Sequence, residues 1–472
     1  MDPAESVREE GPSESGGTPT TAAPSGRIQR GDELELRIES LAFGGAGVAR
    51  MDGYVVFVSG AVPGDRVRAI VQRRKRAFAE ARAVEIIAPG PDRIEPLADH
   101  PGAPWQVLSY ERQLEVKQSQ VFDALRRIGH LDGFALEPIV PAAERWRYRN
   151  KLEYSFGRDP SGRLVCGFHA PGRWDEIVGI DDCLLASEPA NRARERIVAW
   201  CREQGLSVHD RRSGEGMLRN LVVREGRRTG ALQVRLVTAP GELDRDSLAA
   251  AGEGLDGLLW TRHASVAEVT HGGETEVLAG ADRFEETLDG MSFRISSTAF
   301  FQTNTEMAER LYRLAIEYAA PVGFERVFDL YCGIGTIGLL LSPRVAEVWG
   351  LELVPDAIAD AIANARANEV DNARFFAGDV RLALRDLVQR AGRPDVLVVD
   401  PPRAGLSQKV VRRVIEAAPK RIVYVSCNPT TLAPNAAQLV DAGWELVRVR
   451  PVDMFPQTPH IECVAELVRR SA

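Results

Sequence analysis

The stretch that decides the fold of this chain is DLYCGIGTIG, residues 329–338. Residues 326–330 are a short, mostly apolar run that predicts a buried strand. The glycines at positions 333, 335 and 338 then predict a tight turn into a helix, with a backbone that can approach a ligand closely. A glycine pattern of this kind alone would equally fit a dinucleotide, so the residues that follow it have to decide the ligand.

Carboxylates follow successive predicted strands in this part of the chain. Glu352 ends the strand 348–351, Asp379 follows the strand 374–376, and Asp400 ends the strand 396–399. Because the carboxyl ends of parallel strands meet at one edge of a sheet, these residues and Asp329 predict one acidic crevice. Such a crevice repels phosphates, which weighs against a dinucleotide. It favours S-adenosylmethionine, which is cationic and has no phosphate, with Glu352 placed to accept both ribose hydroxyls.

A possible nucleophile lies at the end of another predicted strand. The sequence VSCNP, residues 425–429, follows the apolar run 421–425, so Cys427 would lie at the mouth of the sheet. The alternative for Cys427 is a structural thiol, since free cysteines are often small buried apolar residues. Glu462 begins the apolar strand 461–467, where a carboxylate is either buried with a partner or used in chemistry, and we favour chemistry.

Length and composition bound the class of protein. A chain of 472 residues favours about three domains, and 44% hydrophobic with 27% charged residues is typical of a soluble globular protein. No apolar run approaches the roughly 20 residues that span a bilayer, and the N-terminus does not have the layout of a signal peptide. Six cysteines without paired spacing argue against a disulfide framework. We therefore expect a cytoplasmic protein with reduced thiols and no membrane partner.

The formal net charge of −8 is unevenly distributed. Residues 1–26 hold five carboxylates against one arginine among Pro, Ser, Gly and Thr, which predicts a disordered tail. The overall charge therefore does not exclude a nucleic-acid partner for the folded part.

Residues 27–88 predict a small, five-stranded β-barrel of the OB-like kind, with short strands separated by glycine and proline turns. A basic run lies between its last two strands, just before Phe78, and consists of Arg73, Arg74, Lys75 and Arg76. Such a run on a barrel loop would suit an RNA backbone and a stacked base, although a solvated hairpin tip fits the run equally well.

Residues 89–290 predict a central α+β domain. It begins with a linker at 89–104 and an amphipathic helix at 110–128, and a second helix at 189–204 interrupts its strands. Several basic residues near strand ends would either contact phosphates or form ordinary ion pairs, and both interpretations stay open: Arg147, Arg149, Lys151, Arg219 and Arg224.

Two groups of motifs resemble known families. The phrases GGAGVAR (44–50) and GYVVFVSGAVPGDRV (53–67) resemble a TRAM domain, an RNA-binding barrel. The motifs FFQTN (300–304), DLYCG (329–333), DPPR (400–403), SCNP (426–429) and HIE (460–462) together resemble the S-adenosylmethionine-dependent RNA uracil-C5 methyltransferases. This resemblance implies a Rossmann-like class I methyltransferase domain over residues 291–472 and an RNA-recognition role for the central domain.

The resemblance also implies roles for individual residues. Cys427 would be the nucleophile and Glu462 the proton acceptor, while Arg403 would contact RNA or the uracil. The implied contacts with S-adenosylmethionine are Gln302, Tyr331, Thr336, Glu352, Asp379 and Asp400. Apart from the resemblance, the basic residues Arg73, Arg74, Lys75, Arg76 and Arg149 are expected to contact RNA, and neither a metal site nor an obligate protein partner is expected.

The chemistry of C5 methylation needs these residue types. Addition of a thiolate to C6 of uracil makes C5 nucleophilic, and a carboxylate must later remove the C5 proton so that the thiol can leave. His460 is an alternative base, but a structural histidine is favoured. Cys332 and Cys463 are expected to be packing residues, and Asn428 with Pro429 is expected to fix the turn that presents Cys427.

The sequence departs from this family in two places. Many members bind an iron–sulfur cluster through four cysteines, but residues 100–106 hold none and only Cys183 remains, so no cluster is expected. Pro434 and Asn435 replace the family's usual Arg-Asp, which puts any role of those two side chains in doubt.

Three functions follow from the sequence. The first is S-adenosylmethionine-dependent methylation of uracil C5 in transfer or ribosomal RNA. The second is an amino-methyltransferase of the same fold, although such an enzyme normally has an aromatic residue in place of Arg403 and needs no Cys427. The third is an RNA-binding protein without turnover, which would be expected to lose Cys427, Glu462 or the glycine turn.

Overall fold

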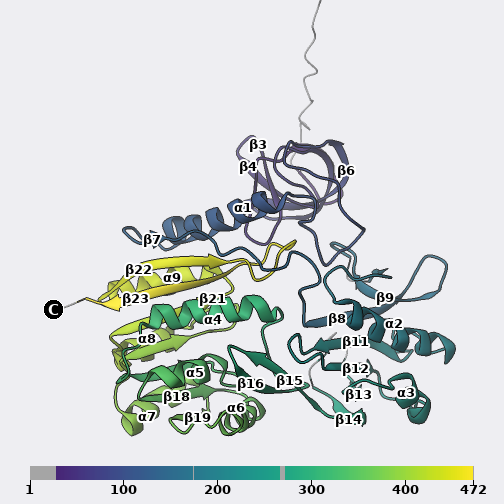
Figure 1. Ribbon diagram of the computed structural model, residues 1–472. Helices are drawn as coiled ribbons and strands as arrows, with labels where there is room; N and C mark the ends of the chain where they lie inside the picture. The colour runs from purple at the N-terminus through teal and green to yellow at the C-terminus, as the bar shows by residue number, and fades with distance from the viewer. Residues whose placement is uncertain (1–27, 174, 266–269, 271, 471–472) are drawn as a thin grey trace, which may run out of the picture.

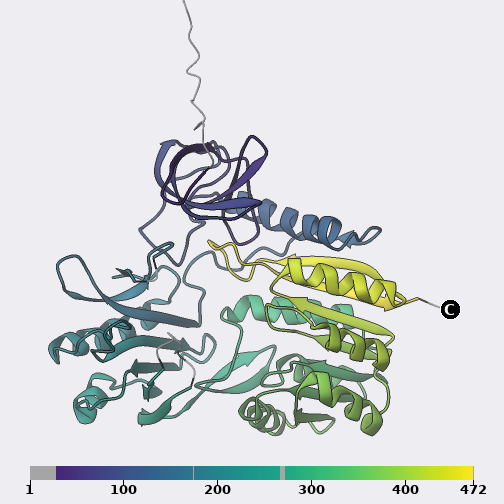
Figure 2. The same ribbon diagram turned by 180° about the vertical axis from the view of Figure 1, so that it is seen from behind.

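The computed structural model describes residues 28–173, 175–265, 270 and 272–470. The tail 1–26, predicted to be disordered, lies outside the described residues. A small barrel lies at one end of the molecule, with a central sheet and a C-terminal sheet side by side below it (Figures 1 and 2). In the part of the chain that the structure describes, no helix is long and apolar enough to cross a membrane.

The N-terminal barrel is a curled sheet with the strand order β1-β5-β6-β4-β3-β2. Alternate side chains such as Leu34 and Leu36 are buried inside it, while their neighbours are exposed. The strands are β1 (Glu33–Arg37), β2 (Ser40–Leu41), β3 (Gly47–Met51), β4 (Tyr54–Ser59), β5 (Arg66–Arg74) and β6 (Phe78–Ala88). The barrel thus has one strand more than the predicted five, because the two-residue β2 is too short to show an alternating pattern.

The segment between the barrel and the first helix has no named helix or strand, in agreement with the predicted linker, yet it is fixed in place. The guanidinium of Arg93 pairs with the buried carboxylate of Asp65, with Nη2 and Oδ2 2.8 Å apart. This ion pair ties the linker to the barrel.

The predicted helix at 110–128 is confirmed as α1 (Tyr110–Asp123) followed by a π-helical turn η1 (Ala124–Ile128). Its buried face is partly polar, because Gln113 and Lys117 are fully buried, whereas Phe122 and Ile128 are exposed. Beyond η1, the short strand β7 (Ala135–Leu136) joins the C-terminal sheet beside β22.

The central region is built on a seven-stranded sheet with the order β10-β9-β8-β11-β12-β13-β14. The helices α2 and α3 pack against it around a core that includes Trp200, Leu221 and Leu248. Its elements are β8 (Lys151–Arg158), β9 (Leu164–His169), β10 (Ile177–Gly179), α2 (Glu188–Glu203), β11 (Leu218–Glu225), β12 (Leu232–Thr238), α3 (Arg245–Ala251), β13 (Gly257–Arg262) and β14 (Glu274–Gly280). A two-stranded sheet follows, made of β15 (Arg283–Leu288) and β16 (Met291–Ser296).

The C-terminal sheet has the order β19-β18-β17-β20-β21-β23-β22-β7. The five strands from β19 to β21 are parallel, and β23 then runs antiparallel to β21. Its remaining strands are β17 (Arg326–Leu330), β18 (Glu347–Glu352), β19 (Ala373–Ala377), β20 (Val396–Val399), β21 (Arg421–Ser426), β22 (Trp444–Val452) and β23 (Glu462–Arg469). Wholly buried strands such as β20 explain the continuous apolar runs in the sequence.

Helices cover both faces of this sheet (Figures 1 and 2). One apolar core contains residues of α4, α5 and α6, and the other contains residues of α1, α7, α8 and α9. The helices are α4 (Thr305–Ala319), α5 (Thr336–Leu341) with the 3₁₀ turn η2 (Ser342–Arg344), α6 (Pro355–Ala367), α7 (Val380–Ala391), α8 (Gln408–Ala417) and α9 (Pro429–Asp441). This is the doubly covered parallel sheet that the sequence predicts, and it presents its strand ends at one edge. The domain boundaries at residues 27, 89 and 291 stay predictions.

Candidate active site

The glycine turn follows β17 as predicted and has the backbone that glycine permits. Gly333 and Gly335 have φ values of 54° and 85°, and Gly335 is the N-cap of α5. Gly338 lies so close to the strand that an added Cβ would come within 2.9 Å of the Asp329 carboxylate. The amide of Gly338 donates to Asp329 Oδ2 over the same distance, 2.9 Å. The glycines therefore allow α5 to start against the strand end.

A pocket lies at this edge of the sheet, with two carboxylates in its lining, Asp329 and Asp400. Tyr331 and Thr336 also line it, and no lysine or arginine does so among its described lining residues. Burial raises the pKa of both carboxylates to about 7, and the charge of Asp400 contributes to the shift of Asp329. Asp329 Oδ1 is buried and has no hydrogen-bond partner among the described residues. This pocket is suited to a cationic ligand.

Three of the six predicted cofactor contacts line this pocket, namely Tyr331, Thr336 and Asp400. Glu352 lies beside it and accepts hydrogen bonds from the amides of Gly333 (3.3 Å) and Val354 (3.0 Å).

The other two predicted contacts are Asp379 and Gln302. Asp379 caps α7 and pairs with Arg381, which keeps the pKa of the carboxylate low. Gln302 is buried, and its backbone carbonyl accepts a hydrogen bond from Asn150 Nδ2 at 2.9 Å. Neither belongs to the lining of the pocket.

Sequence reasoning missed Tyr312, which reaches the pocket from α4. It lies within an amphipathic helix with no local motif, so no sequence signal marks it.

The register of two antiparallel strands brings Cys427 and Glu462 together. Ser426 at the end of β21 pairs with Cys463 of β23, so Cys427 and Glu462 are the next residues in the same register. Cys427 is half-buried and Glu462 is buried. Burial, with the carboxylates of Glu462 and Asp400, raises the pKa of the thiol to about 12. Burial and Asp400 likewise raise the pKa of Glu462 well above its usual value.

The turn after Cys427 is held by side-chain hydrogen bonds. Asn428 is the N-cap of α9, where its Oδ1 accepts from the amide of Thr430 at 3.0 Å, and Pro429 occupies the first turn. Asn428 Nδ2 also donates to the carbonyl of Arg403 at 3.0 Å. This agrees with the predicted role of Asn428 and Pro429, and it links the Cys427 turn to the loop after β20.

Asn435, whose role the sequence left in doubt, has defined partners. Its Oδ1 accepts from the amide of Leu406 (2.8 Å) and from the hydroxyl of Tyr424 (3.0 Å), while its Nδ2 donates to the carbonyl of Leu406 (3.0 Å). It therefore fixes the far end of the same loop. Pro434 lies inside α9.

Basic and aromatic groups surround the mouth of this site. Arg403 is exposed, and its guanidinium lies 6.0 Å from the ring centroid of Phe43, a residue of the barrel loop between β2 and β3. The guanidinium of Arg149 lies 5.7 Å from the ring centroid of Phe455. His460 packs edge-on against Phe455, and burial together with Arg403 and Arg149 lowers its pKa to about 4. An imidazole with so low a pKa is a weak base, which agrees with a structural role.

The other predicted RNA contacts lie on the barrel hairpin and in the central region. Arg73 and Arg74 end β5, and Lys75 and Arg76 lie in the turn between β5 and β6. Of the remaining basic residues, Arg147 pairs with Asp182, Lys151 pairs with Glu153, and the buried Arg224 donates to the carbonyls of Ser296 and Ala299. For these three the structure shows contacts within the protein.

The described residues contain no group of three or more His, Cys, Asp or Glu side chains that could hold a metal ion. Cys183 lies 3.3 Å from Nε2 of His100, and both side chains are buried. Burial lowers the pKa of His100 to about 4. One thiol and one imidazole do not make the four-ligand set of an iron–sulfur cluster.

The chain is similar to two protein-family models and to full-length relatives. The model of the tRNA (uracil-5-)-methyltransferase family matches residues 243–470, and the TRAM domain model matches residues 27–84. An uncharacterised RNA methyltransferase of Halalkalibacterium halodurans is 37% identical over 449 residues, which are 93% of this chain and 98% of the relative. Another, from Bacteroides thetaiotaomicron, is 38% identical over 456 residues, 91% of this chain and 100% of the relative.

A solved structure is similar over almost the same range. The tRNA (uracil-54, C5)-methyltransferase of Pyrococcus abyssi, solved in complex with S-adenosyl-L-homocysteine, has 31% sequence identity and a TM-score of 0.74. The match covers 92% of this chain and 100% of that structure. These findings confirm the predicted fold class, with the TRAM barrel at the N-terminus.

Proposed function

Because the chain belongs to the family of S-adenosylmethionine-dependent RNA methyltransferases that join a TRAM domain to a tRNA (uracil-5-)-methyltransferase domain, we propose that it methylates C5 of one uridine in a transfer or ribosomal RNA. The proposal includes Cys427 as nucleophile, Glu462 as proton acceptor and a cytoplasmic location. The observation that supports it most is the β21–β23 register, which brings a thiol and a buried carboxylate side by side next to the acidic pocket.

The acidic pocket suits S-adenosylmethionine, which supplies an electrophilic methyl group when bound. Asp329 and Asp400 would face its positive charge, and Glu352 is near the turn where a ribose would lie. A cation between the two carboxylates would favour their charged forms and remove the cost of burying them unpaired.

Cys427 and Glu462 have different roles in the proposed reaction, the first as nucleophile and the second as proton acceptor. The sulfur of Cys427, as a thiolate, would add to C6 of the uracil. The electron pair of the C5–C6 double bond would then form the new bond from C5 to the methyl carbon, while the bond between that carbon and the sulfonium sulfur breaks. The Glu462 carboxylate then removes the proton from C5, the double bond re-forms, and the C6–S bond breaks to release the thiolate. The products are 5-methyluridine, S-adenosylhomocysteine and one proton.

Burial and the carboxylate of Asp400 raise the pKa of both groups in the free enzyme, and Glu462 adds to the shift of Cys427. The positive charge of Arg403 acts in the opposite direction and lowers the pKa of Cys427 and Glu462. Binding of the cationic cofactor beside Asp400 would offset the repulsion that Asp400 exerts on the charged forms of Cys427 and Glu462. The site therefore becomes reactive when cofactor and RNA bind, which protects the thiol until then.

The test is mass spectrometry of the protein mixed with S-adenosylmethionine and 5-fluorouridine-substituted tRNA or rRNA. Fluorine at C5 cannot leave as a proton, so the wild type should retain a methylated covalent adduct that Cys427→Ala lacks. If neither protein forms an adduct while S-adenosylmethionine binding is intact, the uracil-C5 assignment fails, and amino-methylation or RNA binding without turnover takes its place.

A further inference from the structure

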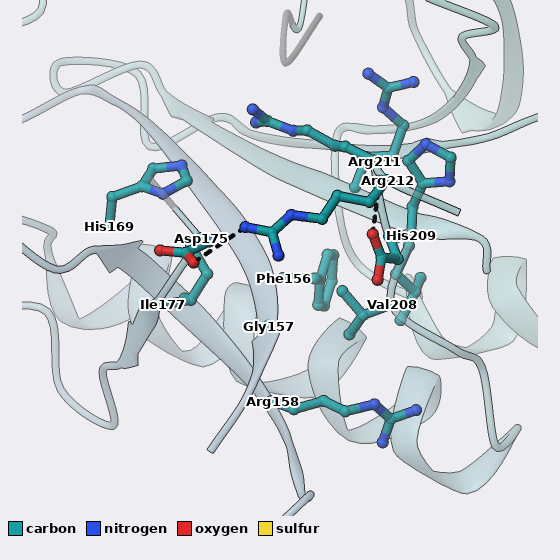
Figure 3. A pocket seen from close by; sticks show the side chains of 13 residues that line it. Phe156, Gly157, Arg158, His169, Asp175, Ile177, Val208, His209, Arg211 and Arg212 are labelled. Carbon is teal, nitrogen blue, oxygen red and sulfur yellow. Dashed lines mark hydrogen bonds and ion pairs between the residues drawn. The ribbon is translucent and has the colours of Figure 1, made fainter. Parts of the chain in front are cut away.

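A cavity of about 410 Å³ lies in the central region, between the β9–β10 edge of its sheet and the loop that joins α2 to β11 (Figure 3). Its described lining shares no residue with the acidic pocket. The volume falls within the range of about 300–1,000 Å³ that is usual for ligand pockets.

Arginine dominates the charge of this cavity. Its described lining residues include four arginines and two aspartates: Arg158, Arg211, Arg212 and Arg219, with Asp175 and Asp210. The chain as a whole has a net charge of −8, so this local excess of positive charge is opposite to the average. Such a lining attracts anions.

The arginines come from three segments, since Arg158 ends β8, Arg211 and Arg212 lie in the α2–β11 loop, and Arg219 lies in β11. Figure 3 shows Arg212 reaching across from the α2–β11 loop towards Asp175 on the β9–β10 hairpin, where Nη2 and Oδ2 are 3.6 Å apart. Arg219 is buried and donates to the carbonyl of His263 at 2.9 Å, which fixes its orientation. Burial and the neighbouring Arg211 lower the pKa of Arg219. An anion between these two guanidinium groups would relieve their repulsion.

The rest of the lining is apolar or aromatic. Phe156, Ile177, Val208 and Leu218 contribute apolar side chains, and His169 and His209 add imidazole rings. An apolar surface bordered by guanidinium groups matches a nucleotide, which joins a flat base to a phosphate.

The cavity adjoins the TRAM barrel through the β9–β10 hairpin. A Cβ atom added to Gly172 in the turn of this hairpin would lie 3.1 Å from Nε2 of Gln72 and 3.8 Å from Cδ of Arg82. Gln72 lies in β5 immediately before the basic run at 73–76. The hairpin thus connects the cavity to the basic turn of the barrel, along which an RNA strand could run.

We propose that this cavity binds a phosphate and the adjoining base of the RNA substrate, outside the methyl-transfer site. The inference rests on the proposed function, because it takes the ligand to be the RNA that is methylated. Asp175 would hold Arg212 across the cavity until a phosphate replaces its carboxylate. A free mononucleotide has the same chemistry, but the contact with the barrel favours a strand that extends beyond the cavity.

The test compares Arg211→Gln/Arg212→Gln with a control pair of exposed arginines in the same region, Arg163→Gln/Arg192→Gln. Both variants lose two positive charges. Binding of a 20-nucleotide single-stranded RNA is measured by fluorescence anisotropy over a range of salt concentrations, and uridine 5′-monophosphate is tested in parallel. The melting temperature verifies folding, and Arg212→Gln alone serves if the double variant is unstable.

We expect the cavity variant to bind the RNA about tenfold more weakly, with a salt slope smaller by about 0.7 for each phosphate that its arginines no longer neutralise. The control should differ from wild type by less than about twofold, as expected for exposed charges. Equal losses of affinity in both variants would overturn the proposal, as would a loss confined to the mononucleotide.

A methyl-transfer assay on unmodified tRNA and rRNA transcripts distinguishes a failure of this inference from a failure of the proposed function. A raised KM with unchanged kcat in the cavity variant supports both. If the wild type transfers no methyl group but the cavity variant still loses RNA affinity, the proposed function fails, and the cavity binds RNA that is not a methylation substrate. If methyl transfer and RNA affinity are unchanged in the variant, only the cavity inference fails.

Discussion

The guanidinium of Arg403 lies 6.0 Å from the ring centroid of Phe43, so a loop of the N-terminal barrel contacts the loop that borders Cys427. Phe43 also packs against the apolar core of the C-terminal sheet. Nearby, Gly45 lies close enough to Pro459 that an added Cβ would come within 2.9 Å of its ring. The N-terminal barrel and the loop beside the proposed nucleophile are thus joined by direct contacts around the same mouth.

We expect Phe43→Leu to slow the reaction of Cys427 with iodoacetamide about threefold. This factor corresponds to the free energy of one exposed cation–π contact. The reason is that a less ordered Arg403 lowers the pKa of Cys427 less. Phe43→Trp keeps an aromatic face and should restore the rate. Rates that are equal in Phe43→Leu and the wild type would show that the ring does not position Arg403.

A buried ion pair supports the segment that leads to Glu462. Lys117 of α1 donates to Asp453 at 2.6 Å and to the carbonyl of Phe455 at 3.0 Å, and neither charged side chain has exposed surface. We expect Lys117→Met to destabilise the protein by about 3–5 kcal/mol, because it leaves a buried carboxylate unpaired. Urea unfolding measures this loss.

The exposed pair Arg127–Asp123 provides the control, since Arg127→Ala should cost less than about 1 kcal/mol. Lys117→Met combined with Asp453→Leu should recover part of the stability, because it removes the unpaired charge. A double variant no more stable than the single one would mean that the cost lies in poorer packing or in the hydroxyl of Tyr110, which donates to Asp453 at 2.8 Å.

The sequence predicted local features well and long-range contacts poorly. The ends of β17 and β20 were predictable because parallel strands buried on both faces are continuous apolar runs. The polar buried face of α1 was not predictable, because Gln113 and Lys117 find partners at Gln457 and Asp453, more than 300 positions away. Tyr312 and Phe43 were missed for the same reason, since each reaches the site only through tertiary packing.

We expect Glu462→Gln to reduce turnover by about 10²- to 10⁴-fold, the usual contribution of a positioned proton acceptor. The amide is similar in size to the carboxylate but cannot accept the C5 proton, so the covalent adduct should accumulate even on RNA without fluorine. Denaturing gel electrophoresis with labelled RNA detects it, and Cys427→Ala should give none. His460→Gln is the matched control, and a loss of turnover there with normal turnover in Glu462→Gln would assign the base to His460.

The affinity for S-adenosylmethionine should increase as the pH rises through about 7, the pKa to which burial raises Asp400 and Asp329. Below this pH the carboxylates are protonated, and above it their negative charges attract the sulfonium. For each group, the dissociation constant should fall by up to about tenfold per pH unit and then level off. Calorimetric titration between pH 5.5 and 8.5 measures this profile.

S-adenosylhomocysteine has nearly the same shape without the positive charge, so its affinity should not increase in this way, and Asp400→Asn should flatten the profile of S-adenosylmethionine. The stability of the free protein should depend on pH in the opposite direction. Both groups keep their protons longer in the folded state than in the unfolded chain, where the pKa is about 3.9, so the free energy of unfolding should decrease between about pH 4 and pH 7. An affinity for S-adenosylmethionine that is independent of pH would show that these carboxylates do not face the sulfonium.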